Sequence, residues 1–152
     1  MYRCSEKYKD ACLIGQKEYA SAYRSLIMLV RIKQHNIFLA EELLARDLQD
    51  IILVGAGDMC DLFLEELVGT EVNILSILER RIGKYRSHYK RHNVVALNTV
   101  GSESLRDRKI IVMDVLRFNE YMEFLIDKGV EVDNIYSIEE VLACVLMRGR
   151  MK

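Results

Sequence analysis

A glycine turn between an apolar run and a helical segment is the part of this sequence best suited to chemistry. The stretch Gly55-Ala56-Gly57-Asp58-Met59-Cys60 matches the pattern GxGxx(small residue) and directly follows the apolar residues 51–54. In a strand-turn-helix of this kind, the first glycine permits the sharp turn and the second lets a phosphate approach the backbone. The turn therefore predicts a phosphate-binding corner, with a tight ligand-free turn as the alternative.

Two residues depart from the usual glycine pattern. Cys60 stands in place of the third glycine and is small enough to keep the helix close to the strand. Asp58 lies where the first N–H groups of the helix would hold a pyrophosphate. Its carboxylate either caps the helix or weakens phosphate binding, and the sequence leaves open whether it blocks the site.

Charged residues follow two later strands at the same predicted edge of the sheet. Glu79 lies 24 residues after Gly55, near the distance expected for an acid that hydrogen-bonds a ribose hydroxyl. Arg80 and Arg81 come next, and arginine at this place would instead accept a phosphate on the ribose. Asp114 ends a later strand, and topology alone predicts that it lies at the same edge of the sheet. The predicted ligand-binding residues are Gly55, Ala56, Gly57, Asp58, Glu79, Arg80, Arg81 and Asp114.

The segment "RRIGKYRSHYKRH", residues 80–92, concentrates positive charge. It holds six Lys or Arg residues, two His, two Tyr and no acid. At the carboxyl edge of the sheet it would attract a diphosphate, and Tyr85 or Tyr89 could stack on a base or sugar. A solvated charged loop is the alternative. Nucleic-acid binding is disfavoured because the charge is confined to one loop. His88 and His92 lack a third ligand, so no metal site is predicted.

Strands alternate with helices from residue 50 onward. The expected strands are Ile51 to Val54, Val72 to Leu78, Val94 to Leu97, Ile110 to Met113 and Ile135 to Ser137. A helix ending at Gly129 and a last helix opened by a Ser137–Glu140 capping box lie among them. Such alternation predicts an α/β fold, a Rossmann-like and mostly parallel sheet with helices on both faces, preceded by N-terminal helices.

The first third of the chain is expected to be helical. Residues 16–33 carry apolar side chains at spacings of three and four, and a second helix is expected from Ile37 to about Arg46 with Asn36 as its N-cap. We divide the chain into an N-terminal helical extension, residues 1–36, and a Rossmann-like nucleotide-binding domain, residues 37–152. The apolar stripe favours a homodimer, although packing on the chain's own sheet would explain the same residues.

Composition indicates an ordinary globular protein. The 152 residues carry a formal net charge of -1, and 51% of them are hydrophobic. The four cysteines are scattered without a CxxC pair, as expected for thiols in a reducing cytosol. Neither a secretory signal nor an apolar run long enough for a bilayer is evident, so we expect a cytoplasmic location and no membrane contact.

Four segments together resemble a known kind of domain. The stretches "DIILVGAGDMCDLFLEEL", "VNILSILE", "KIIVMD" and "FLIDKGVEVDNIYSIEEVL" are similar to small Rossmann-like domains of bacterial surface-polysaccharide biosynthesis proteins. One such relative is the N-terminal nucleotide-sugar-binding domain of sugar O-acyltransferases. The resemblance places the family's turn on Gly55, Ala56 and Gly57 and its strand-two acid on Glu79. The second, β-helical domain of those enzymes has no counterpart here.

The sequence therefore predicts a binding module for a nucleotide-sugar or dinucleotide, linked by the resemblance to polysaccharide biosynthesis. It leaves open whether the ligand is a nucleotide-sugar or NAD(P). The first alternative is a ligand-free interaction or scaffolding protein that dimerises or docks on a glycosyltransferase. The second is an NAD(P)-dependent oxidoreductase, which the lack of a catalytic domain disfavours. No nucleophile–base pair is evident, so no reaction is assigned.

Overall fold

The structure is a computed structural model that describes residues 6–80, 88–89 and 91–151, with side chains described from Tyr19 onward and not for His88. Arg81 and most of the basic segment lie outside the described residues. The prediction that Arg81 binds a ligand therefore stays a prediction.

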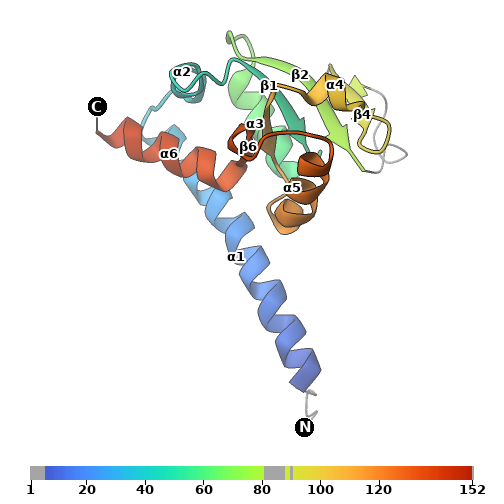
Figure 1. Ribbon diagram of the computed structural model, residues 1–152. Coiled ribbons are helices and arrows are strands. Elements are labelled where there is room, and N and C mark those ends of the chain that lie inside the picture. The colour runs from blue at the N-terminus through green and yellow to red at the C-terminus, as the bar shows by residue number, and fades with distance from the viewer. Residues whose placement is uncertain (1–5, 81–87, 90, 152) are drawn as a thin grey trace.

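A six-stranded sheet forms the centre of the protein, with the strand order β3-β4-β2-β1-β5-β6 (Figure 1). Five neighbouring strands run parallel, and only the short edge strand β3 is antiparallel to its neighbour. The strands are β1 Asp50–Val54, β2 Asn73–Glu79, β3 His88–Tyr89, β4 His92–Ala96, β5 Lys109–Val112 and β6 Ile135–Ser137. The predicted α/β fold with a mostly parallel sheet is confirmed.

Helices cover both faces of the sheet. They are α1 Glu6–Gln34, α2 Leu39–Leu44, α3 Asp58–Leu67, α4 Ser102–Leu105, α5 Phe118–Asp127 and α6 Ile138–Arg150, with short 3-10 turns η2 Val115–Arg117 and η3 Val132–Asn134. One hydrophobic core joins α1, α2, α3 and α6 to one face of the sheet. A second core joins α4 and α5 to the other face.

Strand β1 shows how the sheet packs against helices on both of its faces. Its residues Ile51 and Leu53 belong to the first core, whereas Ile52 and Val54 belong to the second. All four are almost fully buried. A strand covered on both faces reads as a continuous apolar run rather than as alternating apolar and polar residues.

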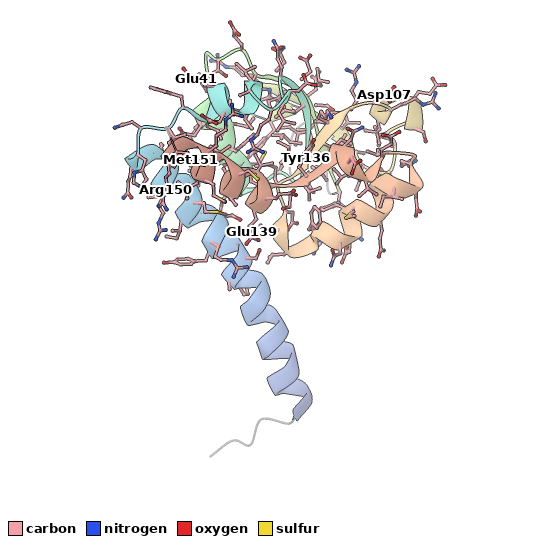
Figure 2. All side chains as sticks on the ribbon, turned by 60° about the vertical axis from the view of Figure 1, so that its left-hand side comes forward. Glu41, Asp107, Tyr136, Glu139, Arg150 and Met151 are labelled. Carbon is pink, nitrogen blue, oxygen red and sulfur yellow. The ribbon has the colours of Figure 1, made fainter. Side chains whose placement is uncertain are left out.

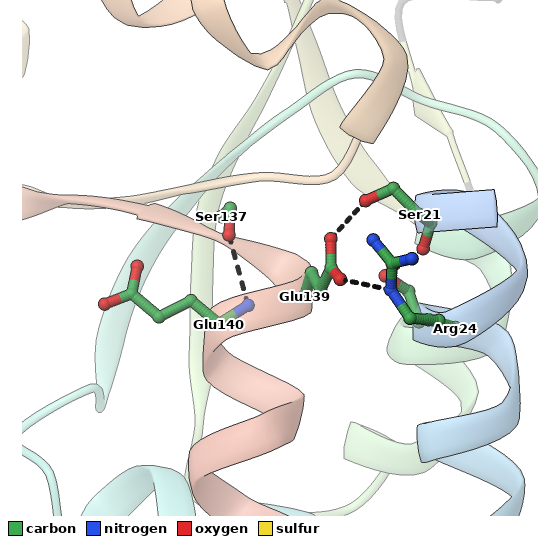
Figure 3. A network of polar contacts seen from close by, with 6 residues as sticks. Ser21, Arg24, Ser137, Glu139 and Glu140 are labelled. Atoms are coloured by element: carbon green, nitrogen blue, oxygen red, sulfur yellow. Dashed lines mark hydrogen bonds and ion pairs between the residues drawn. The ribbon is translucent and has the colours of Figure 1, made fainter. Parts of the chain in front are cut away.

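Two predicted helix boundaries are confirmed by their hydrogen bonds. The Ser137 hydroxyl accepts a bond of 3.1 Å from the Glu140 backbone N–H, so Ser137 caps α6 as the capping-box pattern predicts (Figure 3). Gly129 follows α5 with a φ of 89°, and its N–H bonds to the Ile126 carbonyl at 2.9 Å. Glycine adopts this left-handed conformation at little cost, which suits it to end a helix.

The predicted N-cap role of Asn36 is wrong. Asn36 has a φ of 54° and ends α1, while the N-cap of α2 is Phe38. The N–H of Ile37 bonds back to the Ile32 carbonyl at 3.0 Å, which is the pattern of a Schellman helix end. Asparagine tolerates the left-handed conformation that this end requires, so the same residue type that favours helix starts here closes a helix.

Helix α1 is longer than predicted and leaves the body of the protein at its N-terminal end (Figures 1 and 2). Its later turns belong to the first core, where Leu29 and Ile32 are buried. Ser21 and Arg24 of α1 both donate to the carboxylate of Glu139 on α6, and the Arg24 Nε bond measures 2.9 Å (Figure 3). These contacts hold the middle of α1 against the start of α6.

Among the described residues, none of the helices combines the length and the apolar character needed to cross a bilayer.

Candidate functional site

The predicted site residues meet at the carboxyl edge of the sheet. Successive connections leave β1 toward β2 on one side and return to β5 on the other, which makes the edge between β1 and β5 the switch point where parallel sheets bind ligands. An open cleft of about 390 Å³ lies there. It is lined by Ala22 of α1, residues 55–60 of the glycine turn, and residues 113–116 after β5.

A larger cleft of about 610 Å³ lies away from this edge, lined by side chains such as Leu67, Val72 and His92. Val72 and His92 stand at the start of β2 and β4, the end of a parallel sheet that does not usually hold ligands. Burial lowers the pKa of His92 from its ordinary value, which favours the neutral imidazole. We therefore consider the smaller cleft at the glycine turn to be the candidate site.

Gly55 holds the turn against the segment that follows β5. Its φ of 94° lies in the left-handed region, and a Cβ added there would stand 3.0 Å from the Asp114 Cβ and 3.2 Å from the Asp114 nitrogen. The Gly55 N–H also bonds to the Leu78 carbonyl at 2.9 Å. Both the backbone conformation and the close approach of Asp114 therefore require glycine at this position.

Gly57 differs from Gly55 in both respects. Its φ of 164° is extended backbone that any residue adopts, and a Cβ added there would meet no atom within 4 Å. Gly57 is also the N-cap of α3, and no side chain caps this helix end. Gly57 itself therefore offers no side-chain acceptor to the first turn of α3, whose residues 58–60 line the cleft, and a side chain at Gly57 would occupy space beside it.

Glu79 lies against the glycine turn. Its Oε2 accepts a hydrogen bond of 2.7 Å from the Ala56 backbone N–H, and its Oε1 accepts another of 2.7 Å from the Arg80 backbone N–H. The residue is only 7% exposed. The structure thus brings Glu79, Ala56 and both glycines together, as the sequence predicts. An anionic ligand group would be repelled at Ala56, whereas a hydroxyl could donate to the carboxylate.

The two aspartates of the cleft have different environments. Asp58 is exposed at the first residue of α3 and forms no hydrogen bond or ion pair with the described residues. Asp114 is partly buried, and its Oδ1 accepts a bond of 3.1 Å from the Leu116 N–H, so it caps η2. A negative charge at Asp58 interacts favourably with the helix start and competes with any bound phosphate.

Arg80 points toward α5. Its Nη1 forms an ion pair of 2.9 Å with Glu120, and both side chains are more than half exposed. This residue is absent from the lining of the cleft. Its predicted role as a ligand-binding residue stays a prediction.

Tyr121 of α5 is a neighbour of the site that the sequence analysis does not single out. It is 4% exposed, and burial raises its pKa, with further increases from the negative charges of Glu79 and Asp114. The carboxylates of Glu79 and Asp114 therefore lie near enough to the buried face of α5 to affect the Tyr121 hydroxyl. The signal that could have identified Tyr121 is its hydroxyl group on an otherwise apolar helix face.

No group of three or more potential metal-ligating side chains occurs in the part of the chain that the structure describes.

Comparisons with protein-family models, with curated proteins and with solved structures find no significant match to this chain.

Proposed function

We propose that this protein binds a nucleotide-sugar or a dinucleotide in the cleft at the glycine turn. The observation that carries the proposal is the pairing, at the switch point of the sheet, of an uncapped helix start with a buried carboxylate. The helix start suits a phosphate group, and the carboxylate suits a sugar hydroxyl. The two are linked by Ala56, whose N–H bonds to Glu79.

The phosphate half of the proposal rests on Gly57 and the first turn of α3. Backbone N–H groups at a helix start point outward, and the helix dipole adds partial positive charge. The open space beside Gly57 allows a phosphate to approach the backbone closely. Because Glu79 already takes the Ala56 N–H, the phosphate belongs beside residues 57–59 rather than at the centre of the turn.

The sugar half of the proposal rests on Glu79. A buried carboxylate that accepts two backbone bonds has further lone pairs and can accept from a ligand hydroxyl. A ligand with both a diol and a diphosphate uses the two halves together. The resemblance to polysaccharide-biosynthesis domains favours a nucleotide-sugar, and it is the basis for proposing a cytoplasmic role in the supply or transfer of activated sugars. The cleft explains recognition, and no reaction is assigned to it.

Isothermal titration calorimetry with UDP-glucose, UDP, glucose, NAD and NADP tests the proposal. We expect saturable binding of UDP-glucose or NAD, weaker binding of UDP alone and weakest binding of glucose. Gly57→Ala is expected to weaken binding at least about tenfold, which is the loss of about one phosphate contact. No heat of binding at millimolar ligand, in a sample shown to be folded by circular dichroism, would contradict the proposal.

A ligand-free interaction protein is the second candidate, and two observations favour it. The Ala56 N–H is satisfied within the protein by Glu79, and apolar side chains on α1 are exposed. In that case none of the five titrations gives a heat of binding, and the protein acts only through contacts of α1 with a partner.

A further inference from the structure

Helix α1 has two different apolar faces. One face, which includes Ser25, Leu29 and Ile32, is buried against α6 and the sheet. The other face, a third of a turn away around the helix, is exposed; we call it the α1 stripe. It consists of Tyr19, Tyr23, Leu26 and Val30, whose exposed fractions are 71%, 65%, 39% and 43%. Packing within the chain therefore accounts for only one of the two faces.

The spacing of the α1 stripe is that of a helix-pairing seam. Its members follow one another at intervals of four, three and four residues, the repeat that keeps side chains on one line when two helices wrap around each other. The residues that flank this line are Ala20, Ala22 and Ile27. Ala20 and Ala22 are small, and small flanking side chains allow two helix backbones to approach closely.

Charge favours an identical partner. No charged residue lies within the stripe or in its flanking positions between residues 19 and 30. The one charged residue of this interval, Arg24, lies on the other side of the helix and pairs with Glu139. Two identical stripes therefore meet without like-charge repulsion, whereas a nucleic acid or a charged peptide would find no countercharge.

The length of α1 and its projection from the body of the protein suit pairing with the α1 helix of a second copy. The helix is 29 residues long, about 44 Å, and its N-terminal half extends away from the body of the protein (Figures 1 and 2). A projecting helical segment has little stability of its own in water and normally depends on packing against another element. In a two-fold pair with antiparallel helices centred on the stripe, residue 19 of one copy would lie opposite residue 30 of the other, so that residues 15–34 of the two helices would overlap.

The exposed side chains of the stripe supply part of the area that a dimer needs. Tyr19 and Tyr23 alone expose roughly 200–340 Å², because a tyrosine presents about 150–250 Å². A stable interface needs about 800 Å² from each partner. Leu26 and Val30, which are 39% and 43% exposed, add to the area that the tyrosines supply.

We propose that the α1 stripe is the interface of a two-fold symmetric homodimer in which the α1 helices of two copies pair antiparallel. The stripe also borders a mainly apolar cleft of about 430 Å³. This cleft shares Ala22, Asp58 and Met59 with the cleft at the glycine turn. The second copy of α1 therefore lies beside the candidate ligand site and completes its outer wall.

Sedimentation analysis of the full chain without ligand tests the dimer. We expect twice the mass of the chain for the wild type across the micromolar range. The double variant Tyr19→Glu/Leu26→Glu is expected to weaken dimerisation at least about tenfold, because it places carboxylates within the apolar interface. Val68→Glu is the matched control, since Val68 is 79% exposed outside the stripe, and it is expected to remain dimeric.

Urea unfolding of all three proteins shows that each is folded before its mass is compared. A wild type that is monomeric throughout this range would overturn the proposal. A wild-type dimer that the stripe variant leaves intact would overturn it as well, because the interface would then lie elsewhere. The measurement contains no ligand, so its failure leaves the proposed function standing and can be told apart from a failure of ligand binding.

Discussion

Glu79 is a buried acid whose two carboxylate oxygens each accept a backbone N–H, from Ala56 and from Arg80. A charged acceptor that holds two backbone amides at 2.7 Å stabilises the shape of the glycine turn. In Glu79→Gln only one side-chain oxygen remains, and the amide NH₂ would face a backbone donor. We expect a loss of about 1–3 kcal/mol in the free energy of unfolding.

Urea unfolding followed by circular dichroism measures this loss. Glu120→Gln is the matched control, because the Glu120 side chain is 63% exposed and forms its ion pair with the exposed Arg80. Its effect is expected to stay within about 0.5 kcal/mol. Equal effects of the two substitutions would show that the contacts of Glu79 with the turn are unimportant for stability.

The two glycines of the turn provide a second pair of substitutions at the residue scale. Gly55→Ala places a methyl group 3.0 Å from the Asp114 Cβ in a left-handed conformation, and we expect a cost of about 1–3 kcal/mol. Gly57→Ala meets no atom within 4 Å and has extended backbone, so its stability should stay within about 1 kcal/mol of the wild type. Thermal unfolding compares the two variants. A Gly57→Ala protein that is less stable than Gly55→Ala would contradict the different roles assigned to these glycines.

The contact between α1 and α6 makes stability depend on pH. Burial raises the pKa of Glu139, but hydrogen bonds from Ser21 and Arg24 outweigh this effect and hold the pKa below its ordinary value. The folded state thus prefers the charged carboxylate. The resulting stability is fully present above the ordinary pKa, about 4.3, and is lost as pH falls through the lowered pKa.

Glu139→Gln tests this dependence. We expect the substitution to cost about 1 kcal/mol at neutral pH, and the difference from the wild type should shrink as the pH falls below 4.5. Urea unfolding between neutral and acidic pH measures both effects. Glu131→Gln is the control, because Glu131 is exposed and forms no ion pair with the described residues. A difference that grows on acidification would have the wrong sign.

Substitutions at Ser137 test the stability of α6, the helix that contains Glu139. Its hydroxyl accepts the Glu140 N–H and closes the first turn of α6. Ser137→Ala is expected to lower the free energy of unfolding by about 1 kcal/mol, whereas Ser137→Asp, which keeps a capping oxygen, should retain most of it. Equal losses in both variants would indicate that Ser137 stabilises the protein in another way.

At the scale of the elements, local signals explain what the sequence predicts well. Continuous apolar runs identify β1 and β5, because strands buried on both faces need no polar side. Local pattern predicts helix boundaries less well where one residue type suits both ends of a helix. Asn36, for example, ends α1 instead of starting α2. The short strand β3 has only two residues and was not predicted, since its existence depends on pairing with β4.

The site could be predicted only in part, for a related reason. The spacing of Gly55 and Glu79 follows from the regular length of one strand-helix-strand unit, and the structure brings these residues together. Which atom Glu79 contacts depends on its side-chain conformation, so its bond to the Ala56 N–H could not be read from spacing. Tyr121 reaches the same edge from α5; its hydroxyl group marks it on the apolar face of that helix, but its position near Glu79 and Asp114 follows from the packing of α5 on the sheet.

At the scale of the whole molecule, the sheet joins two surfaces with different roles. The carboxyl edge of β1 and β5 holds a cleft at a helix start, and the buried acid Glu79 lies behind its glycine turn and bonds to Ala56. Helix α1 presents an apolar stripe that borders the same cleft through Ala22. The proposed ligand site and the proposed helix-pairing surface therefore lie close together, and we expect ligand binding and dimerisation to influence each other.

A titration of the ¹⁵N-labelled protein with UDP-glucose, followed by the backbone amide signals, distinguishes a ligand site from a ligand-free corner. We expect the amide signals of Gly57, Asp58 and Met59 to shift saturably in the wild type and to shift much less in Gly57→Ala, which should fold normally. Unchanged signals at these three amides, or equal shifts in both proteins, would contradict binding at the start of α3.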